Sequence, residues 1–188
     1  IAGVCPDCQL MIAKPMNDQG AGIDSTIAEA IIWAADNGAK VINMSVGGPD
    51  YSQIQEDAIN YAWNKGAISV AAAGNSGVSQ PFYPAALPRV ISVAATDSTD
   101  KKASFSNYGN WVNFAAPGVN IFSTLPTSSF ILQSKERVNT SYDYLSGTSM
   151  ATPVVSGVIG LIWSSKYGTS NTAVVQRLTS TVDKIAGT

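Results

Sequence analysis

Apolar residues fall into short continuous runs along the first half of the chain, and amphipathic segments separate these runs. The runs predict four buried strands, at residues 9–14, 41–46, 68–73 and 90–95. Two intervening segments, 24–38 and 52–65, repeat apolar positions every three or four residues and predict helices. Continuous apolar strands that alternate with such helices are typical of a parallel sheet covered on both faces. We therefore predict a three-layer, doubly wound α/β fold with a mostly parallel sheet.

Each of these two helices should bury one face. Asp24 or Ser25 is in position to cap the first helix. The buried face of that helix should consist of Ile27, Ile31, Ala34 and Ala35. The buried face of the second helix should consist of Ile54, Ala58, Tyr61 and Ala62.

The second half of the chain has a weaker pattern. Short extended pieces are expected around Phe105 and at 112–115, and a strand is expected at 119–124. Residues 127–143 are polar and weakly patterned, which indicates a surface loop. An amphipathic helix from Asn171 to about Val182 follows near the end of the sequence.

The stretch from Tyr144 to Trp163 predicts a strongly apolar helix. The residues after Ser149 leave no polar stripe, which is typical of a helix buried on all sides. Pro153 lacks a backbone N–H and fits only the first turn, so the helix should begin near Thr148 or Ser149. A serine hydroxyl at this positive helix end, among unpaired N–H groups, could stabilise an oxyanion. The alternative is that Ser149 only caps the helix.

Composition limits the class of protein. The chain has 188 residues, of which 45% are apolar and 13% are charged, as expected for one core-rich domain. Its net charge of -2 gives no reason to expect nucleic acid or an anionic membrane as a partner. No apolar run is long enough to cross a bilayer, and the start shows no signal-peptide pattern.

The two cysteines, Cys5 and Cys8, form the sequence Cys-Pro-Asp-Cys. A zinc site would need a second pair of ligands, and the chain has no histidine. We favour a local disulfide or two free thiols in a turn over a redox pair, because the redox motif normally opens a helix.

Unusual residues gather where the predicted strands end, which is where open parallel sheets bind ligands. Glycines at these ends keep backbone groups accessible for pairing with an extended peptide. Asn75 could donate its side-chain amide to an oxygen outside the sheet, or it could be an ordinary turn residue. The three ends are Gly20–Gly22 after the first strand, Ser45–Gly48 after the second and Ala72–Asn75 after the third.

These motifs resemble those of the subtilisin-like serine proteases, and most closely those of their thermitase branch. The resemblance extends over nearly the whole chain and is most specific at the serine motif. The matching motifs are Gly147-Thr-Ser-Met-Ala-Thr-Pro153, Ala71-Ala-Ala-Gly-Asn75, Ser45-Val-Gly-Gly48, Ala116-Pro-Gly118, Tyr61-Ala-Trp-Asn-Lys-Gly66 and Ser104-Phe-Ser-Asn-Tyr-Gly109.

The resemblance implies a role for each matching residue. Ser149 would be the nucleophile, Asn75 the oxyanion-hole donor and the backbone N–H of Ser149 a second donor. Phe82 falls where the family varies the floor of the substrate pocket; its bulk would shorten that pocket, unless it is an ordinary core aromatic. The implied substrate-binding residues are Gly20, Ala21 and Gly22 on one edge, Ser45, Val46 and Gly47 on the other, and Ala72, Ala73 and Gly74 in the pocket wall.

The family's catalytic triad also contains an aspartate and a histidine that precede the matching segment. Because the chain has no histidine, we expect it to be nearly inactive alone and to be the C-terminal portion of a longer protease. The predicted domain, residues 1–188, would then be truncated at both ends and its sheet incomplete on the N-terminal side. The alternative is a pseudo-protease that binds peptides without cutting them. A nucleotide-binding domain is disfavoured because no Gly-rich phosphate loop follows the first strand.

Further expectations rest on the resemblance alone. The family implies secretion, polypeptide substrates with small or medium apolar residues, and a monomer once the missing N-terminal segment is present. It also implies structural calcium but no cofactor for the chemistry. The backbone carbonyls that could belong to cation sites are those of Ile1, Ala85, Leu87 and Val90.

Overall fold

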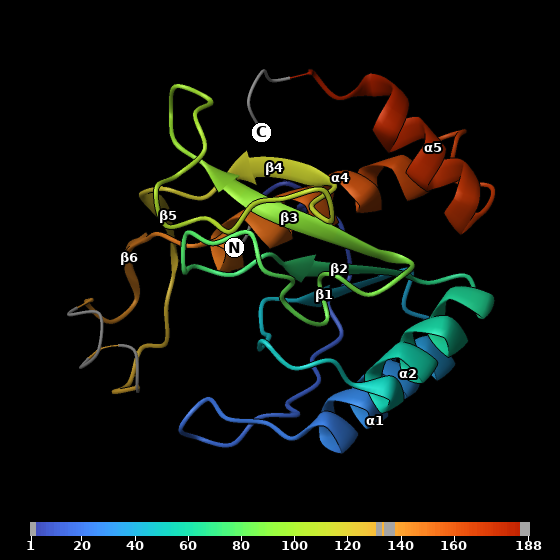
Figure 1. Cartoon of the computed structure of the whole chain (residues 1–188), viewed down its shortest axis with the longest axis horizontal. Coiled ribbons are helices and arrows are strands. Elements are labelled where there is room, and N and C mark those ends of the chain that lie inside the picture. The colour runs from blue at the N-terminus through green and yellow to red at the C-terminus, as the bar shows by residue number, and fades with distance from the viewer. Residues whose placement is uncertain (1–2, 131–132, 134–137, 185–188) are drawn as a thin grey trace.

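A central parallel sheet organises the protein. The computed structural model describes residues 3–130, 133 and 138–184. Four strands lie in the order β1-β2-β3-β4, and each is parallel to its neighbour (Figure 1). This arrangement confirms the predicted α/β fold with a parallel sheet. The strands are β1 (Val41–Met44), β2 (Ile68–Ala72), β3 (Val90–Thr96) and β4 (Phe114–Pro117).

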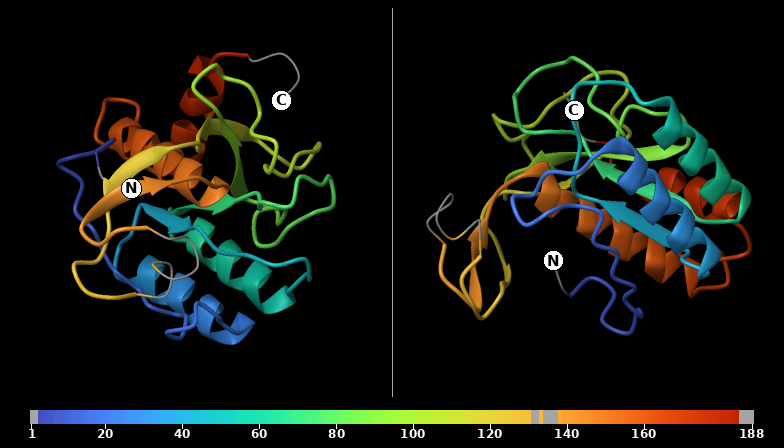
Figure 2. Two further views of the ribbon diagram at one scale, coloured as in Figure 1. Left: turned by 90° about the vertical axis from the view of Figure 1, so that its left-hand side faces the viewer. Right: turned by 90° about the horizontal axis from the view of Figure 1, so that it is seen from below.

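Helices cover both faces of this sheet (Figures 1 and 2). On one face, α1 and α2 bury residues such as Ile31 and Ile59 against Ile42 of β1. On the other face, α4 and α5 bury Ile159 and Val174 together with apolar residues of β2 and β3. The two separate cores explain why the strands read as continuous apolar runs rather than alternating ones. The helices are α1 (Asp24–Asp36), α2 (Gln53–Asn64), α4 (Thr148–Trp163) and α5 (Asn171–Thr181).

A two-stranded hairpin projects from the body of the molecule (Figure 2). It consists of β5 (Ile121–Thr124) and β6 (Tyr142–Leu145), which pair antiparallel. The predicted loop over 127–143 is therefore wrong at its end, because β6 already begins at Tyr142. The alternating sequence Tyr-Asp-Tyr-Leu is too short to give a clear strand pattern. Its two tyrosines are exposed; Tyr142 stacks on Phe122 of β5, and the ring of Tyr144 contacts Phe122 at a tilt.

The segment 9–14 is not the buried strand that its apolar sequence predicts. Leu10 and Ile12 are 87% and 79% exposed, and the segment has no strand assignment. A run of apolar residues becomes a strand only where a neighbouring strand offers its backbone groups. In the described part of the chain, β1 is the edge of the sheet on this side and nothing pairs with residues 9–14.

Two further helix predictions need correction. Ile23 occupies the N-cap of α1 without a side-chain cap bond, so neither Asp24 nor Ser25 caps this helix. In α2, Ala58 and Ala62 are buried as predicted, whereas Ile54 and Tyr61 are exposed. Gln55 and Ile59 are the other two buried residues of this helix.

The helix α4 begins at Thr148 as predicted but is not buried on every side. Leu161 is 46% exposed, because α4 forms an outer layer whose far side faces away from the sheet. Part of that far side is covered by the N-terminal segment. In this segment Cys5 and Cys8 form a disulfide, which is one of the two interpretations that we favoured from the sequence. A Cβ added at Gly160 would lie 2.8 Å from the sulfur of Cys8.

None of the helices in the described ranges combines the length and hydropathy that a bilayer crossing requires.

Candidate active site

Ser149 lies in the first turn of α4, with Gly147 at the N-cap. Its side chain is half-buried, and its hydroxyl donates to the backbone carbonyl of Ser45 at 3.4 Å. No titratable side chain among the described residues forms a hydrogen bond with this hydroxyl. The backbone N–H of Ser149 belongs to the first turn, where helix geometry provides no acceptor. The residue thus presents a hydroxyl and an unpaired donor at the positive end of the helix.

Asn75 is held against the same helix start by its side-chain oxygen. Asn75 Oδ1 accepts from the backbone N–H of Thr148 at 2.8 Å and from the Thr148 hydroxyl at 2.9 Å. Because the oxygen is occupied, the amide nitrogen is turned away from Thr148 and remains available as a donor. Asn75 Nδ2 lies 3.3 Å from the position that a Cβ on Gly147 would take. The structure therefore brings the predicted donor and the predicted nucleophile to one place.

Thr148 is a positioning residue that our sequence analysis missed. Its side chain is fully buried, and its hydroxyl accepts from the backbone N–H of Gly74 at 3.1 Å while donating to Asn75. One hydroxyl thus connects the end of β2 to the start of α4. The available signal was a threonine next to the serine in Gly-Thr-Ser, but a buried hydroxyl cannot be distinguished from a solvated one in sequence.

Asn107 was also missed, although it lies in one of the quoted motifs. It is 1% exposed and donates its amide to the carbonyl of Ala73 at 2.9 Å. Its side-chain oxygen accepts from the backbone N–H groups of Ser76 and Val78. These bonds hold the loop that carries Asn75 on both sides, so Asn107 fixes the donor without touching it.

Phe82 lies against two glycines of the predicted pocket. A Cβ at Gly47 would lie 2.5 Å from Phe82 Cε1, and a Cβ at Gly74 would lie 3.1 Å from Phe82 Cγ. Gly74 also has φ +99°, a conformation that L side chains rarely adopt. Ala72 and Ala73 are buried beside Gly74, at the end of β2. The ring therefore packs against both Gly47 and Gly74, where any larger residue would collide with it.

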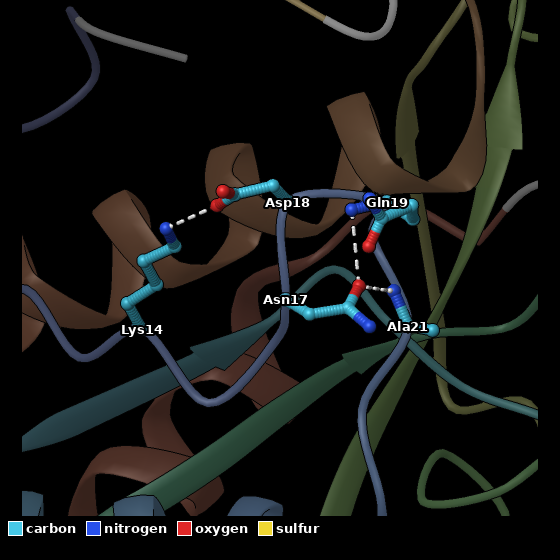
Figure 3. Close-up of polar contacts among 5 residues, drawn as sticks. All are labelled: Lys14, Asn17, Asp18, Gln19 and Ala21. Atoms are coloured by element: carbon cyan, nitrogen blue, oxygen red, sulfur yellow. Dashed lines mark hydrogen bonds and ion pairs between the residues drawn. The ribbon is translucent and has the colours of Figure 1, made fainter.

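The loop that carries Gly20–Gly22 is stabilised by Asn17 (Figure 3). Asn17 Oδ1 accepts from the backbone N–H groups of Gln19 and Ala21, and the backbone carbonyl of Ala21 accepts from the N–H of Asn17. Both backbone groups of Ala21 are thus occupied. The N–H of Gly20 also donates to the carbonyl of Asn17, at 3.0 Å, so Gly20 keeps only its carbonyl for pairing with another chain. Of the described residues on this edge, Gly22 is the one whose N–H and carbonyl both remain available for such pairing.

The second predicted edge follows β1. The Ser45 carbonyl accepts from Ser149, whereas Gly48 exchanges two backbone bonds with Tyr83, at 2.8 Å each. Val46 and Gly47 lie between these two contacts. The structure thus joins the Ser45–Gly47 edge directly to Ser149.

The described residues show no cluster of acidic side chains that would hold calcium. Calcium takes six to eight oxygen ligands, usually including carboxylates. The proposed ligands Ala85, Leu87 and Val90 offer three backbone carbonyls, and that of Leu87 already accepts from the N–H of Val90 at 3.3 Å. No group of three or more acidic, histidine or cysteine side chains converges within the described ranges. Ile1, the fourth proposed ligand, lies outside the described residues.

Comparison with known proteins gives the geometry a context. A family model described as the subtilase family matches residues 1–187. A thermophilic serine proteinase of Bacillus sp. strain AK1 is 46% identical over 188 residues, which are all of this chain and 43% of that protein. Thermitase of Thermoactinomyces vulgaris is 45% identical over all of this chain and 62% of its own length. The solved structure of sphericase superposes with a TM-score of 0.79 and 35% identity, covering 96% of this chain and 62% of that one. The chain thus spans less than two thirds of each of these proteins.

Proposed function

The chain belongs to the subtilase family, and from that premise we propose that it carries the nucleophile and the oxyanion hole of a serine endopeptidase. Ser149 attacks the carbonyl carbon of a peptide bond, and a base takes the hydroxyl proton. The side-chain amide of Asn75 and the backbone N–H of Ser149 then donate to the oxyanion. The amine leaves with a proton, and water hydrolyses the acyl-enzyme. The observation that supports this proposal most is the bonding of Asn75 Oδ1 to Thr148, which leaves the amide nitrogen free.

The base has to come from elsewhere, because the sequence contains no histidine. We propose that residues beyond these 188 supply it, together with its aspartate, in a longer protein. The 188-residue chain alone should be nearly inactive. In subtilisin, loss of the catalytic histidine lowers turnover by about a millionfold.

The substrate would lie as an extended strand between the Gly20–Gly22 edge and the Ser45–Gly47 edge. We propose that the side chain before the scissile bond enters the pocket walled by Ala72–Gly74. The ring of Phe82 would form its floor, so small side chains should be preferred. Phe82→Ala should shift the cleavage preference toward larger apolar side chains, as measured with a peptide library in the active protein.

Fluorophosphonate labelling tests the catalytic proposal directly. The longest product of the gene should be labelled at Ser149, and Ser149→Ala should abolish the label. Asn75→Ala should slow labelling by about 100-fold or more, as expected for loss of one oxyanion donor. Thr172→Ala, an exposed threonine of α5, serves as a matched surface control and should react at the parent rate.

A second candidate function is peptide binding without cleavage. It is favoured by the absence of histidine and by the contact of the Ser149 hydroxyl with a carbonyl rather than a base. A full gene product that binds peptides but is not labelled would support it and contradict catalysis.

Secretion, calcium binding and a monomeric state stay predictions from the family resemblance. Mass spectrometry of culture medium, calcium titration and analytical ultracentrifugation of the longest product would test them.

A further inference from the structure

A proline leaves one carbonyl of α4 without its helical partner. In an α-helix, the carbonyl of residue 149 accepts from the backbone N–H of residue 153. Residue 153 is proline, which has no N–H. The carbonyl that loses its partner is therefore that of Ser149, the proposed nucleophile itself. A partly buried carbonyl without a partner is unfavourable, so a replacement donor is expected.

The replacement comes from the end of β1, 104 residues away in sequence. The hydroxyl of Ser45 donates to the backbone carbonyl of Ser149 at 3.0 Å, in a partly buried contact. The two residues also meet in the reverse sense, because the Ser149 hydroxyl donates to the Ser45 carbonyl at 3.4 Å. The first turn of α4 is therefore attached to the sheet directly at its reactive residue.

Two further side chains orient the Ser45 hydroxyl. The side-chain amide of Asn43, in β1, donates to Ser45 Oγ at 3.1 Å. The hydroxyl of Ser156 lies 2.9 Å from Asn43 Oδ1 and 3.1 Å from the carbonyl of Thr152, and shares its one hydrogen between these two acceptors. Since a hydroxyl has one hydrogen, the bond accepted from Asn43 directs the Ser45 hydrogen toward Ser149. Ser156 belongs to α4, two turns after Ser149, so the polar chain starts and ends on the same helix.

We propose that Ser45 is a positioning residue for Ser149, whose hydroxyl replaces the helix bond that Pro153 removes and is oriented by Asn43. Fixing the Ser149 carbonyl fixes the peptide plane on its C-terminal side, and with it the direction of the hydroxyl. The catalytic consequence rests on the proposed function, whereas the bond replacement does not. If Ser45 were an ordinary serine at a strand end, its contribution to stability would not depend on which residue occupies position 153. This dependence therefore distinguishes a positioning residue from an ordinary strand-end serine.

Thermal unfolding of the 188-residue chain tests the bond replacement. Ser45→Ala should lower the unfolding midpoint by about 2–4 °C, as expected for one net hydrogen bond in a domain of this size. In a Pro153→Ala background, the restored N–H supplies the Ser149 carbonyl, so Ser45→Ala should have almost no further effect. Ser164→Ala, which removes a hydroxyl bonded to the Leu161 carbonyl, is a control that should be equally costly in both backgrounds. Equal loss from Ser45→Ala in both backgrounds would overturn the proposal.

A second pair of variants keeps the test independent of Pro153. Ser45→Thr retains the hydroxyl, whereas Ser45→Val has nearly the same shape without it. The threonine variant should unfold at a higher temperature than the valine variant, by a margin similar to the loss from Ser45→Ala. Equal midpoints for the two variants would contradict a role for the hydroxyl.

The positioning role is tested by kinetics in the longest product of the gene. Ser45→Val should lower kcat by about tenfold relative to Ser45→Thr with KM changed less than about twofold, because the lost contact orients the nucleophile rather than the substrate. Adding Pro153→Ala to the Ser45→Val variant should restore most of the lost kcat. An equal kcat for the two variants would overturn the positioning role while leaving catalysis by Ser149 intact. A product in which even the parent is never labelled would overturn the proposed function, whereas the unfolding result would still stand.

Discussion

The strand β2 and the segment 9–14 are both short apolar runs, yet they end in opposite environments. Every residue of β2 is buried, between β1 and β3 and under helices on both faces. In segment 9–14, Leu10 and Ile12 are almost fully exposed. The difference shows that apolar sequence supplies only half of a strand. The other half is an adjacent backbone, which β2 has on two sides and residues 9–14 lack among the described residues.

Different forces hold these two regions in place. The region around β2 is stabilised by burial, because its side chains fill two cores. The N-terminal region is fixed by local bonds: the Cys5–Cys8 disulfide, the turn around Asn17 and the bond from the Thr26 hydroxyl to the Pro15 carbonyl. The same substitution should therefore lower the free energy of unfolding more in the region around β2 than in the N-terminal region.

The largest difference is expected from removing the same apolar side chain in each region. Ile159 of α4 is fully buried, whereas Ile12 is 79% exposed. Ile159→Ala should lower the free energy of unfolding by about 2–5 kcal/mol, because it removes buried methyl groups and leaves a cavity. Ile12→Ala should change it by less than about 0.5 kcal/mol. Urea unfolding measures both, and a loss above about 1 kcal/mol at Ile12 would show that segment 9–14 is packed in solution.

A smaller difference is expected between two glycines with positive φ. Gly74 has φ +99° and Gly20 has φ +76°, so alanine is strained at both. A Cβ at Gly74 would also lie 2.5 Å from Asn107 Nδ2, whereas a Cβ at Gly20 would meet nothing within 4 Å. Gly20→Ala should therefore lower the free energy of unfolding by about 1 kcal/mol, and Gly74→Ala by about 2–4 kcal/mol.

Fluorescence-monitored urea unfolding of the two glycine variants would check this order. The Gly74 variant should also move Asn75, so it should lose labelling at Ser149 in any product that is labelled. Equal losses of stability would mean that the Asn107 side chain moves aside without cost.

The sequence predicted the elements whose signals are local. The strands β2 and β3 and the start of α4 were placed within one or two residues, because long apolar runs and a proline constrain them. The failed strand at 9–14 and the missed strand β6 depend on partners that a local pattern does not show. The buried face of α2 was predicted correctly at Ala58 and Ala62 but not at Ile54 and Tyr61. Packing of α2 on α1, which buries Gln55 beside Asp24, decides the orientation of the helix.

The residues of the candidate site also fall into a predictable group and an unpredictable group. Ser149 and Asn75 could be singled out because their residue types are chemically suited to attack and donation, and the structure brings both to the start of α4. Thr148, Asn107 and Asn43 act by orienting other groups. Their importance lies in bonds between segments 29 to 113 residues apart, such as Val78 to Asn107 (29 residues) and Ser156 to Asn43 (113 residues). Such bonds leave no periodic signal in a single sequence.

The smallest expected effect is the pH dependence contributed by one aspartate in each region. The pKa of Asp36 is lowered because the Tyr61 hydroxyl and Lys65 donate to its carboxylate. The pKa of Asp18 is lowered because Lys14 donates to it. A lowered pKa in the folded state means that the charged form stabilises the fold above the unfolded pKa, near pH 4. This contribution is lost as the pH falls below that value.

Replacing each aspartate with asparagine should distinguish the two regions. Asp36 connects α1 to α2, so its contacts break when the domain unfolds, and Asp36→Asn should flatten the decline of the urea midpoint between about pH 4 and pH 2. Asp18 and Lys14 are four residues apart in a loop, where the same pair can form in the unfolded chain. Asp18→Asn should therefore leave the profile unchanged, since a contact present in both states contributes nothing to their difference. Both carboxylates are exposed, so the Asp36 effect should shrink at high salt, and a flattening at Asp18 instead would mean that local contacts in the N-terminal region are lost on unfolding.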